Sequence, residues 1–333
     1  MKAFGIHAYK QKILTQMEVP TPTLTKDDVL VEIKAASINP IDFKTRDGKL
    51  KLLLPYTMPL ILGSDFSGTI TQVGQNVTRF KVGDNVYGRP QKNRIGTFAE
   101  AIAIHQDDIA IMPSNISFEE AASLPLVGLT SYQALHDLMN LQPNQKILIQ
   151  AGAGGVGTFA IQLAKYLGAH VATTASPKGF ELVTEMGADT IVNYREEDFE
   201  TVLKDYDFVF DTLGGDSLKK AFTILKPGSK IVSVSGLPNK RFAEAYSVPL
   251  WKKLLFTFAT RPITALEKKY NIRYDFLFMK PSGEQLEVIS KLVEDGVITP
   301  VIDSIYPFSE TQQALDYAET GRAKGKVIIS MTN

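Results

Sequence analysis

Residues 146–167, KILIQAGAGGVGTFAIQLAKYL, predict a strand, a glycine-rich turn and a helix in direct succession. The run 146–150 is apolar enough for a buried strand, and apolar side chains then recur at helical spacing. The helical positions are Val156, Ala160, Leu163, Ala164 and Leu167. Between strand and helix, residues 152–157 match the pattern G-x-G-x-x-G, which binds a dinucleotide pyrophosphate in this context. The stretch therefore predicts a dinucleotide-binding βαβ unit.

The glycines of this turn have separate expected roles. Gly152 permits the tight turn, Gly154 lets the backbone approach a pyrophosphate, and Gly157 allows the helix to pack closely on the strand. Gly155 and Val156 open the helix, whose N-terminus carries the partial positive charge that attracts an anion. The alternative is a structural glycine turn without a ligand. The strand before it and the helix after it favour the binding site.

The end of the next strand, residues 170–176, indicates which dinucleotide is bound. NAD sites place Asp or Glu there, about 20 residues beyond the glycines, to bind the ribose hydroxyls. This chain has TTASPK at 173–178 instead, which offers the Ser176 hydroxyl and the Lys178 ammonium to a 2′-phosphate. We therefore expect NADPH as the cofactor rather than NADH. The alternative for Lys178 is a solvated lysine at a helix start.

The order of predicted elements indicates an α/β fold. Strands are expected at 170–176, 190–194, 207–215 and 230–236 with helical segments between them, which is typical of a parallel sheet. Before residue 117 the chain is β-rich, with alternating apolar residues at 29, 31 and 33 and a further strand at 98–104. Ser117 and Glu120 have the spacing of a capping box. The tail adds a helix at 284–294, a strand at 297–302, a helix capped by Ser309, and a strand at 326–330.

Composition excludes several classes of function. The 333 residues suggest about two domains, and 36 basic against 36 acidic side chains argue against a nucleic-acid partner. The chain has no cysteine, so disulfides, thiolate nucleophiles and cysteine-ligated metals are excluded. No signal peptide or transmembrane segment is recognisable, which predicts a soluble, cytoplasmic protein.

The position of the glycine turn separates classes of nicotinamide enzyme. It begins near residue 150, whereas short-chain and lactate-dehydrogenase-like chains carry the nucleotide domain first. No tyrosine in this chain has a lysine four residues further on, so the Tyr-Lys chemistry of short-chain enzymes is absent.

Several further motifs resemble those of the medium-chain dehydrogenase/reductase superfamily over essentially the full length. They are GSDFSG at 63–68, VGDNV at 82–86, GLTSY at 128–132 and GKV at 325–327. The resemblance implies a GroES-like β-rich catalytic domain formed by residues 1–122 and 265–333. Between these segments, residues 123–264 would form the NADPH-binding Rossmann domain, a doubly wound parallel sheet.

The chain departs from the zinc-dependent members of that superfamily at all three catalytic ligand positions. Asn39, Ser64 and Leu126 stand where those members have Cys, His and Cys, and no thiolate or imidazole is available there. The four histidines are widely scattered, so no metal site is expected. The chain instead resembles the zinc-free quinone oxidoreductases. SINPIDFK at 37–44 and FLFMKP at 276–281 are especially similar to the alkenal/enone oxidoreductase branch.

The resemblance also implies the positions that contact the cofactor. Asn39, Thr130 and Phe278 would lie near the nicotinamide. Ser176, Lys178 and Tyr194 would contact the 2′-phosphate. The remaining contacts along the cofactor would come from Ser235, Gly236, Leu237 and Lys326. The alternative for Tyr194 is a strand-end aromatic in the core. For Asp42 two roles are expected with equal weight: a functional role in the site, or a structural role as an acceptor for backbone N–H groups.

The expected reaction is hydride transfer from NADPH to a quinone or to the C=C bond of an α,β-unsaturated carbonyl compound. Asn39 and Lys44 are the candidate catalytic donors to the developing oxyanion, and the proton would come from water. A 2-enoyl-thioester reductase that docks an acyl carrier through Arg241, Lys252 and Lys253 is an alternative. A non-enzymatic NADPH-binding structural or RNA-binding protein is another. A homodimer is expected by analogy, and residues 251–260 would form a packed helix or touch a membrane surface.

Overall fold

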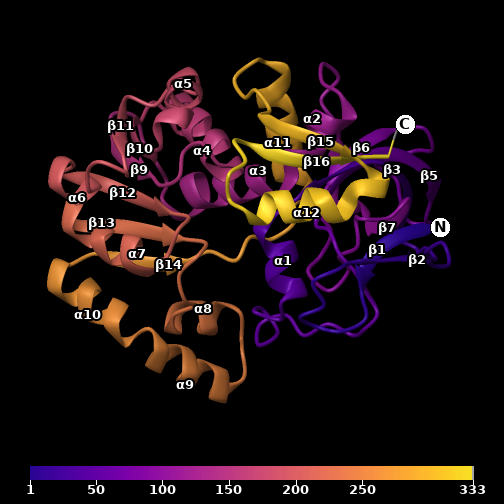
Figure 1. Cartoon of the computed structure of the whole chain (residues 1–333), viewed down its shortest axis with the longest axis horizontal. Helices are drawn as coiled ribbons and strands as arrows, with labels where there is room; N and C mark the ends of the chain where they lie inside the picture. Colours follow the sequence, from indigo (N-terminus) through magenta and orange to yellow (C-terminus); the bar gives the residue numbers. More distant parts are fainter. Residues whose placement is uncertain (332–333) are drawn as a thin grey trace. The chain divides into compact units, whose positions relative to one another are not determined.

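The computed structural model describes residues 1–331, and the chain divides into two compact units (Figure 1). Unit 1 comprises Met1–Leu129 with Lys280–Asn333, and unit 2 comprises Thr130–Met279. The second boundary lies later than the expected residue 264. The physical reason is that Arg273–Phe276 forms strand β14, which pairs in parallel with β13 (Leu225–Ser233) in the sheet of unit 2.

Unit 2 is built on a six-stranded parallel sheet with the order β11-β10-β9-β12-β13-β14. The four remaining strands are β9 (Lys146–Ile149), β10 (His170–Ala175), β11 (Thr190–Asn193) and β12 (Tyr206–Asp211). Numbered along the unit, these strands follow the order 3-2-1-4-5-6 of the Rossmann fold. The predicted doubly wound sheet is therefore confirmed. The strand order reverses between β9 and β12, and in open α/β sheets ligands bind at that point.

The helices of unit 2 follow the strands. They are α4 (Gly155–Tyr166), α5 (Phe180–Glu185), α6 (Phe199–Val202), α7 (Gly215–Ala221), α8 (Lys240–Ala245), α9 (Leu250–Ala259) and α10 (Arg261–Tyr270). Before β9, α3 (Pro125–Tyr132) runs into a π-helical turn at Gln133–Leu138. The sequence pattern was irregular after Gly236, yet this segment holds three helices between β13 and β14.

Unit 1 is β-rich and is assembled from both parts of the chain. A seven-stranded sheet has the order β15-β16-β3-β5-β6-β8, with β7 also paired to β3, and a three-stranded sheet has the order β2-β1-β4. The large sheet contains β3 (Asp28–Ile38), β5 (Asp65–Val73), β6 (Asn85–Gly88), β7 (Ala101–His105), β8 (Ile109–Ile111), β15 (Ile302–Pro307) and β16 (Lys326–Ser330). The small sheet contains β1 (Lys2–Ile6), β2 (Thr15–Glu18) and β4 (Leu60–Ile61). β16 pairs antiparallel with β3, which confirms the β-rich domain expected from the two segments.

Among residues 1–331, four helices lie wholly in unit 1, and α3 begins there. The four are α1 (Pro40–Arg46), α2 (Phe118–Ala122), α11 (Gly283–Glu294) and α12 (Thr311–Glu319). The capping box of Ser117 and Glu120 is present at the start of α2. Two expectations for the tail were wrong. The strand lies at Ile302–Pro307 rather than 297–302, and Ser309 lies inside a 3₁₀ turn, Phe308–Glu310, so that Glu310 occupies the N-cap position of α12.

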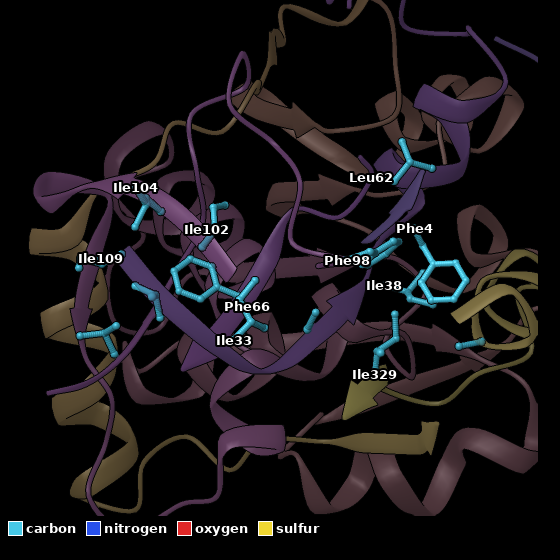
Figure 2. Packing of buried hydrophobic residues seen from close by; sticks show 14 of the residues in the cluster. Phe4, Ile33, Ile38, Leu62, Phe66, Phe98, Ile102, Ile104, Ile109 and Ile329 are labelled. Carbon is cyan, nitrogen blue, oxygen red and sulfur yellow. The ribbon is translucent and has the colours of Figure 1, made fainter. Parts of the chain in front are cut away.

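A continuous apolar core holds unit 1 together (Figure 2). Phe66, Phe98 and Ile33 are fully buried, and Ile329 contributes from the tail. The core joins residues from both chain segments, which stabilises the conformation of α1 and of the loops next to it. In residues 1–331 we find no helix with the length and apolarity needed to cross a bilayer.

Candidate functional site

The glycine turn leaves the start of α4 open to an anion. The N-cap of α4 is Gly154, which has no side chain to bind the first N–H groups of the helix. A Cβ built at Gly154 would meet only Ala151 O, at 3.4 Å, so the space beside this backbone is open. Free N–H groups, a helix dipole and open space together fit a dinucleotide pyrophosphate.

The other two glycines of the motif are required by packing. A Cβ at Gly152 would lie 2.1 Å from Thr173 Oγ1, and one at Gly157 would lie 2.4 Å from Ala151 O. Both positions therefore exclude any side chain. Gly152 and Gly157 therefore let α4 lie close to β9 and β10, whereas Gly154 faces open space.

The three predicted 2′-phosphate residues lie at the carboxyl ends of β10 and β11. Ala175 and Asn193 are register partners in this parallel pair, so Ser176 and Tyr194 leave the two strands side by side. Lys178 is exposed in the 3₁₀ turn Pro177–Gly179, for which Ser176 is the N-cap. Tyr194 is 58% exposed, which excludes the alternative of a core aromatic.

A further cation at this end of the sheet escaped the sequence analysis. Arg195 directly follows Tyr194 and is exposed. An arginine next to a predicted phosphate contact is a usable signal, because guanidinium groups bind phosphate in a bidentate manner.

The loop after β13 is held by a buried carboxylate. Asp211, at the end of β12, accepts hydrogen bonds from the backbone N–H groups of Leu213 and Gly214 and from the hydroxyl of Ser233. Ser233 Oγ in turn accepts from the backbone N–H of Gly236 at 2.8 Å and of Ser235 at 3.2 Å. Burial raises the pKa of Asp211. The sequence analysis missed Asp211, although a single Asp at the end of an apolar strand was a visible signal.

Gly236 and Leu237 are fixed by Tyr274. The Tyr274 hydroxyl donates to Leu237 O at 2.8 Å and lies 2.3 Å from where a Cβ of Gly236 would be. Ser235 donates from its hydroxyl to Thr212 O at 2.7 Å. The predicted segment 235–237 is therefore rigidly positioned at the end of the parallel sheet.

Thr130 and Phe278 complete the candidate residues of unit 2. Thr130 is buried in α3. Phe278 is half-buried in an aromatic cluster with Phe242, Tyr246 and Phe276, and Tyr246 Oη donates to Phe278 O at 2.5 Å. These contacts fix the ring; its expected contact with the nicotinamide stays a prediction.

In unit 1, Asn39 and Asp42 form the start of α1. Asp42 Oδ2 accepts the backbone N–H of Asn39 at 2.7 Å, and Asp42 Oδ1 accepts the hydroxyl of Ser64 at 2.9 Å. The expected structural role of Asp42 as an acceptor for backbone N–H is therefore confirmed. Burial raises the pKa of Asp42 to about 7, against the lowering effect of these hydrogen bonds.

Asp65 lies at the centre of a second set of hydrogen bonds. It is fully buried at the start of β5, and its Oδ2 accepts from Asn39 Nδ2 and Ser37 Oγ, both at 2.8 Å. Its Oδ1 accepts the backbone N–H of Leu126 at 2.9 Å. The ammonium of Lys326 lies 3.5 Å from Oδ2. From the sequence, Asp65 is recognisable only as part of the GSDFSG motif, and this role is not predicted.

Asn39 and Lys326 are bound to each other. Lys326 Nζ donates to Asn39 Oδ1 at 2.5 Å and to Ile38 O at 3.0 Å, and burial lowers the pKa of Lys326. These hydrogen bonds hold the side chains of Asn39 and Lys326 in the interior of unit 1. One donor bond of Asn39, from Nδ2 to Ser37 O, is long at 3.4 Å. This N–H is the one that a ligand can compete for at least cost.

Lys44 differs from Asn39 in being only half-buried on α1. Partial burial, followed by the nearby charge of Lys49, lowers the pKa of Lys44, with no carboxylate acting to raise it. Of the two candidate donors, Lys44 is therefore the one less occupied by interactions with other groups of the protein.

The three positions at which zinc-dependent enzymes carry ligands are joined here by carboxylates. Asp65 binds both the side chain of Asn39 and the backbone of Leu126, and Asp42 binds Ser64. Within residues 1–331 no group of three or more His, Cys, Asp or Glu side chains is arranged to hold a metal ion. The donor set at these positions consists of amide and hydroxyl groups, which do not fit zinc.

A buried arginine near this network also escaped the sequence analysis. Arg89, immediately after β6, is 1% exposed; its Nη1 donates to Pro90 O at 2.6 Å and its Nε has no hydrogen-bond partner. Burial lowers the pKa of Arg89, and the charges of Asp65, Tyr56 and Asp42 act in the opposite direction. Sequence patterns give no signal that separates a buried arginine from a solvated one.

Two family profiles match the chain. The one described as "Zinc-binding dehydrogenase" matches residues 186–329, and "Alcohol dehydrogenase GroES-like domain" matches residues 25–114. Among similar proteins, the 2-methylene-furan-3-one reductase of Solanum lycopersicum is 33% identical over 99% of this chain and 79% of its own length.

Solved structures of two quinone oxidoreductases have a similar fold. The quinone oxidoreductase of Coxiella burnetii has a TM-score of 0.84 at 33% identity, covering 99% of both chains. The Escherichia coli quinone oxidoreductase complexed with NADPH has a TM-score of 0.84 at 27% identity, covering 99% of this chain and 100% of that one.

The network around Asp65 predicts a measurable coupling. Asp65→Asn should lower the free energy of unfolding by about 3–5 kcal/mol, because the buried Lys326 ammonium then loses the carboxylate that lies 3.5 Å from it. Adding Lys326→Met should recover part of this loss, since the two side chains are coupled. Urea unfolding followed by circular dichroism measures both, with Asp216→Asn as a control that loses only an exposed ion pair with Lys219 and changes stability by at most about 1 kcal/mol. Strictly additive losses would show that the pair is not coupled.

The glycine turn gives a second prediction. Gly152→Ala should destabilise the ligand-free protein by about 1–3 kcal/mol, because the new methyl group overlaps Thr173. Gly154→Val should leave stability unchanged and abolish dinucleotide binding, because its side chain fills the space before the α4 N-terminus. Melting temperature and an NADPH titration separate the two effects. Normal NADPH binding by folded Gly154→Val would place the phosphates elsewhere.

Proposed function

The chain belongs to the medium-chain dehydrogenase/reductase superfamily, and we propose that it is a zinc-independent, NADPH-dependent reductase of quinones or of the C=C bond of α,β-unsaturated carbonyl compounds. Its relatives are NAD(P)H oxidoreductases, so it is an oxidoreductase with a nicotinamide cofactor and a small-molecule substrate. The observation that supports zinc independence is the hydrogen-bonded network of Asp42 and Asp65. This network binds Asn39, Ser64 and Leu126, which stand where zinc-dependent members of the superfamily carry ligands.

The residues that would hold the cofactor are those at the carboxyl edge of the parallel sheet. The first N–H groups of α4, beside Gly154, would bind the pyrophosphate. Ser176, Lys178 and Tyr194 would bind the 2′-phosphate, and the absence of a carboxylate in 173–178 supports NADPH over NADH. The bound nicotinamide supplies a hydride.

The chain's own contribution to the reaction would be electrostatic. In a conjugated acceptor, negative charge develops on the carbonyl oxygen, and a fixed donor stabilises it. Lys44 would bind that oxygen with its ammonium group, and the long Asn39 bond to Ser37 O would let Asn39 turn one N–H toward it. The buried Asp65 and Lys326 would act as positioning residues for Asn39. Water would supply the proton to the α-carbon.

The enoyl-thioester alternative receives no support from the contacts of its predicted docking surface. Arg241 lies in ion pairs with Glu267 and Asp275, and Lys253 lies 2.8 Å from Glu244. Two of the three basic side chains predicted for that surface are thereby paired with carboxylates. The expected homodimer, the cytoplasmic location and the lack of a nucleic-acid partner stay predictions.

The cofactor preference can be tested at Lys178. Lys178→Ala should weaken NADPH binding by roughly tenfold, because a lost phosphate contact is worth about 1.4 kcal/mol, and should leave NADH binding nearly unchanged. Lys204→Ala, which removes another exposed lysine of the same unit, should change neither. Fluorescence titration with both nucleotides measures this. An equal loss for NADPH and NADH would show that Lys178 does not contact the 2′-phosphate.

The reaction itself is tested by product analysis with but-2-enal and NADPH. Butanal is the expected product, and turnover should persist after exhaustive chelation. Lys44→Met should lower kcat/KM by roughly 10–1000-fold, the effect of one lost transition-state donor. Lys81→Met, which removes another exposed lysine of unit 1, serves as its control.

Three results would contradict the proposal. But-2-en-1-ol as product would indicate carbonyl reduction, and activity lost on chelation and restored by zinc would indicate a metal enzyme. NADPH binding without turnover on enals, enones, quinones or enoyl thioesters would favour a non-enzymatic protein.

A further inference from the structure

Helix α9 exposes an unusual number of large apolar side chains. Five of its ten residues are large, apolar and 43–71% exposed: Leu250, Trp251, Leu254, Leu255 and Phe258. At 100° per residue they cover an arc of about 140° on one face of the helix. Phe256 lies opposite this arc, is buried, and packs against Phe242 of α8 at 6.3 Å between ring centroids. The helix is therefore already packed on its other side, and the exposed arc is a separate apolar surface.

Basic side chains flank this apolar arc. Lys252 and Lys253 lie on opposite sides of the arc. Arg261 is the first residue of α10, the helix that follows α9 in the chain. Lys252 lies 5.5 Å from the centroid of the Trp251 ring and Arg261 lies 4.6 Å from that of Phe258. The cationic groups thus sit against the aromatic rings of the arc, at its border.

The segment around α9 is also far more basic than the rest of the protein. Residues 240–270 carry seven basic and two acidic side chains, although the whole chain has a net charge of zero. α9 itself contains no acidic residue. The two acidic side chains, Glu244 and Glu267, are paired with Lys253 and Arg241, and the segment as a whole keeps a net positive charge.

The charge pattern decides which partner fits this surface. A second copy of the chain in a two-fold contact would bring the same net-positive surface against this one, and the like charges would repel. An anionic partner has the opposite charge. An apolar arc bordered by lysine and arginine, with Trp, Leu and Phe at its centre, has the composition of helices that lie in the headgroup layer of a bilayer.

We propose that α9 binds this protein to the surface of an anionic phospholipid bilayer. The helix lies parallel to the membrane plane, with its five apolar side chains inserted between headgroups and its basic side chains at the phosphates. No helix in the described part of the chain can span the bilayer, which is consistent with attachment at one surface only. The proposal does not depend on the proposed reaction.

The test is co-sedimentation with vesicles of equimolar phosphatidylcholine and phosphatidylglycerol, compared with pure phosphatidylcholine. The full chain should bind the anionic vesicles roughly tenfold or more tightly, since each basic residue near the surface contributes about 1 kcal/mol. Raising the salt concentration should weaken this binding. Leu254→Glu with Phe258→Glu should abolish it, whereas Tyr166→Glu, on the exposed end of α4, should not.

A second measurement requires no substitution. Trp251 is the only tryptophan of the chain, so its emission should shift to shorter wavelength with anionic vesicles and stay unchanged with neutral ones. Equal binding to both vesicle types, or none, would overturn the proposal. A dimer in sedimentation velocity that Phe258→Glu converts to a monomer would also overturn it, by assigning the arc to a second copy.

Discussion

The buried carboxylate of Asp65 connects more of unit 1 than any other polar group described above. It binds the end of β3 through Ser37, the N-cap of α1 through Asn39, and the first turn of α3 through the backbone of Leu126. Lys326, at the start of β16, lies beside it and donates to Asn39. A buried charge of this kind is tolerated only when it is fully paired, so each of these segments is held in one position. The same carboxylate thus connects Asn39 and Leu126, two of the three positions at which zinc-dependent members of the superfamily carry ligands.

Much of the fold was predictable from local patterns. The strand, turn and helix at 146–167 had a single consistent interpretation, because apolar period, glycine spacing and helix start agree there. Residues 297–310 gave weaker signals, and there the strand and the helix start were misplaced. The assignment of 265–279 failed for a different reason. β14 joins the parallel sheet through pairing with Lys230–Ser233, and pairing partners are not visible in one segment alone.

The candidate site was predictable where function depends on backbone shape and less so where it depends on burial. The glycine motif and the Ser176–Lys178 turn could be read directly, because glycine and the missing carboxylate are local features. Asp211, Asp65 and Arg89 act through burial and through partners distant in sequence. The catalytic and cofactor-binding role of Asn39 stays a prediction, and the nitrogen and oxygen of its side-chain amide are bound to Asp65 and Lys326.

The pairing of β16 with β3 has a consequence for the order of folding during synthesis. Ser37 and Ile328 are register partners, so the main sheet of unit 1 cannot close until nearly 300 intervening residues have been made. Unit 2 is continuous in sequence, and the six strands of its sheet all lie between Lys146 and Phe276, so its sheet can close before β16 is made. Until β16 arrives, β3 exposes an unpaired apolar edge, which is a site for aggregation or chaperone binding. Unit 1 is therefore the part of the nascent chain that most needs protection.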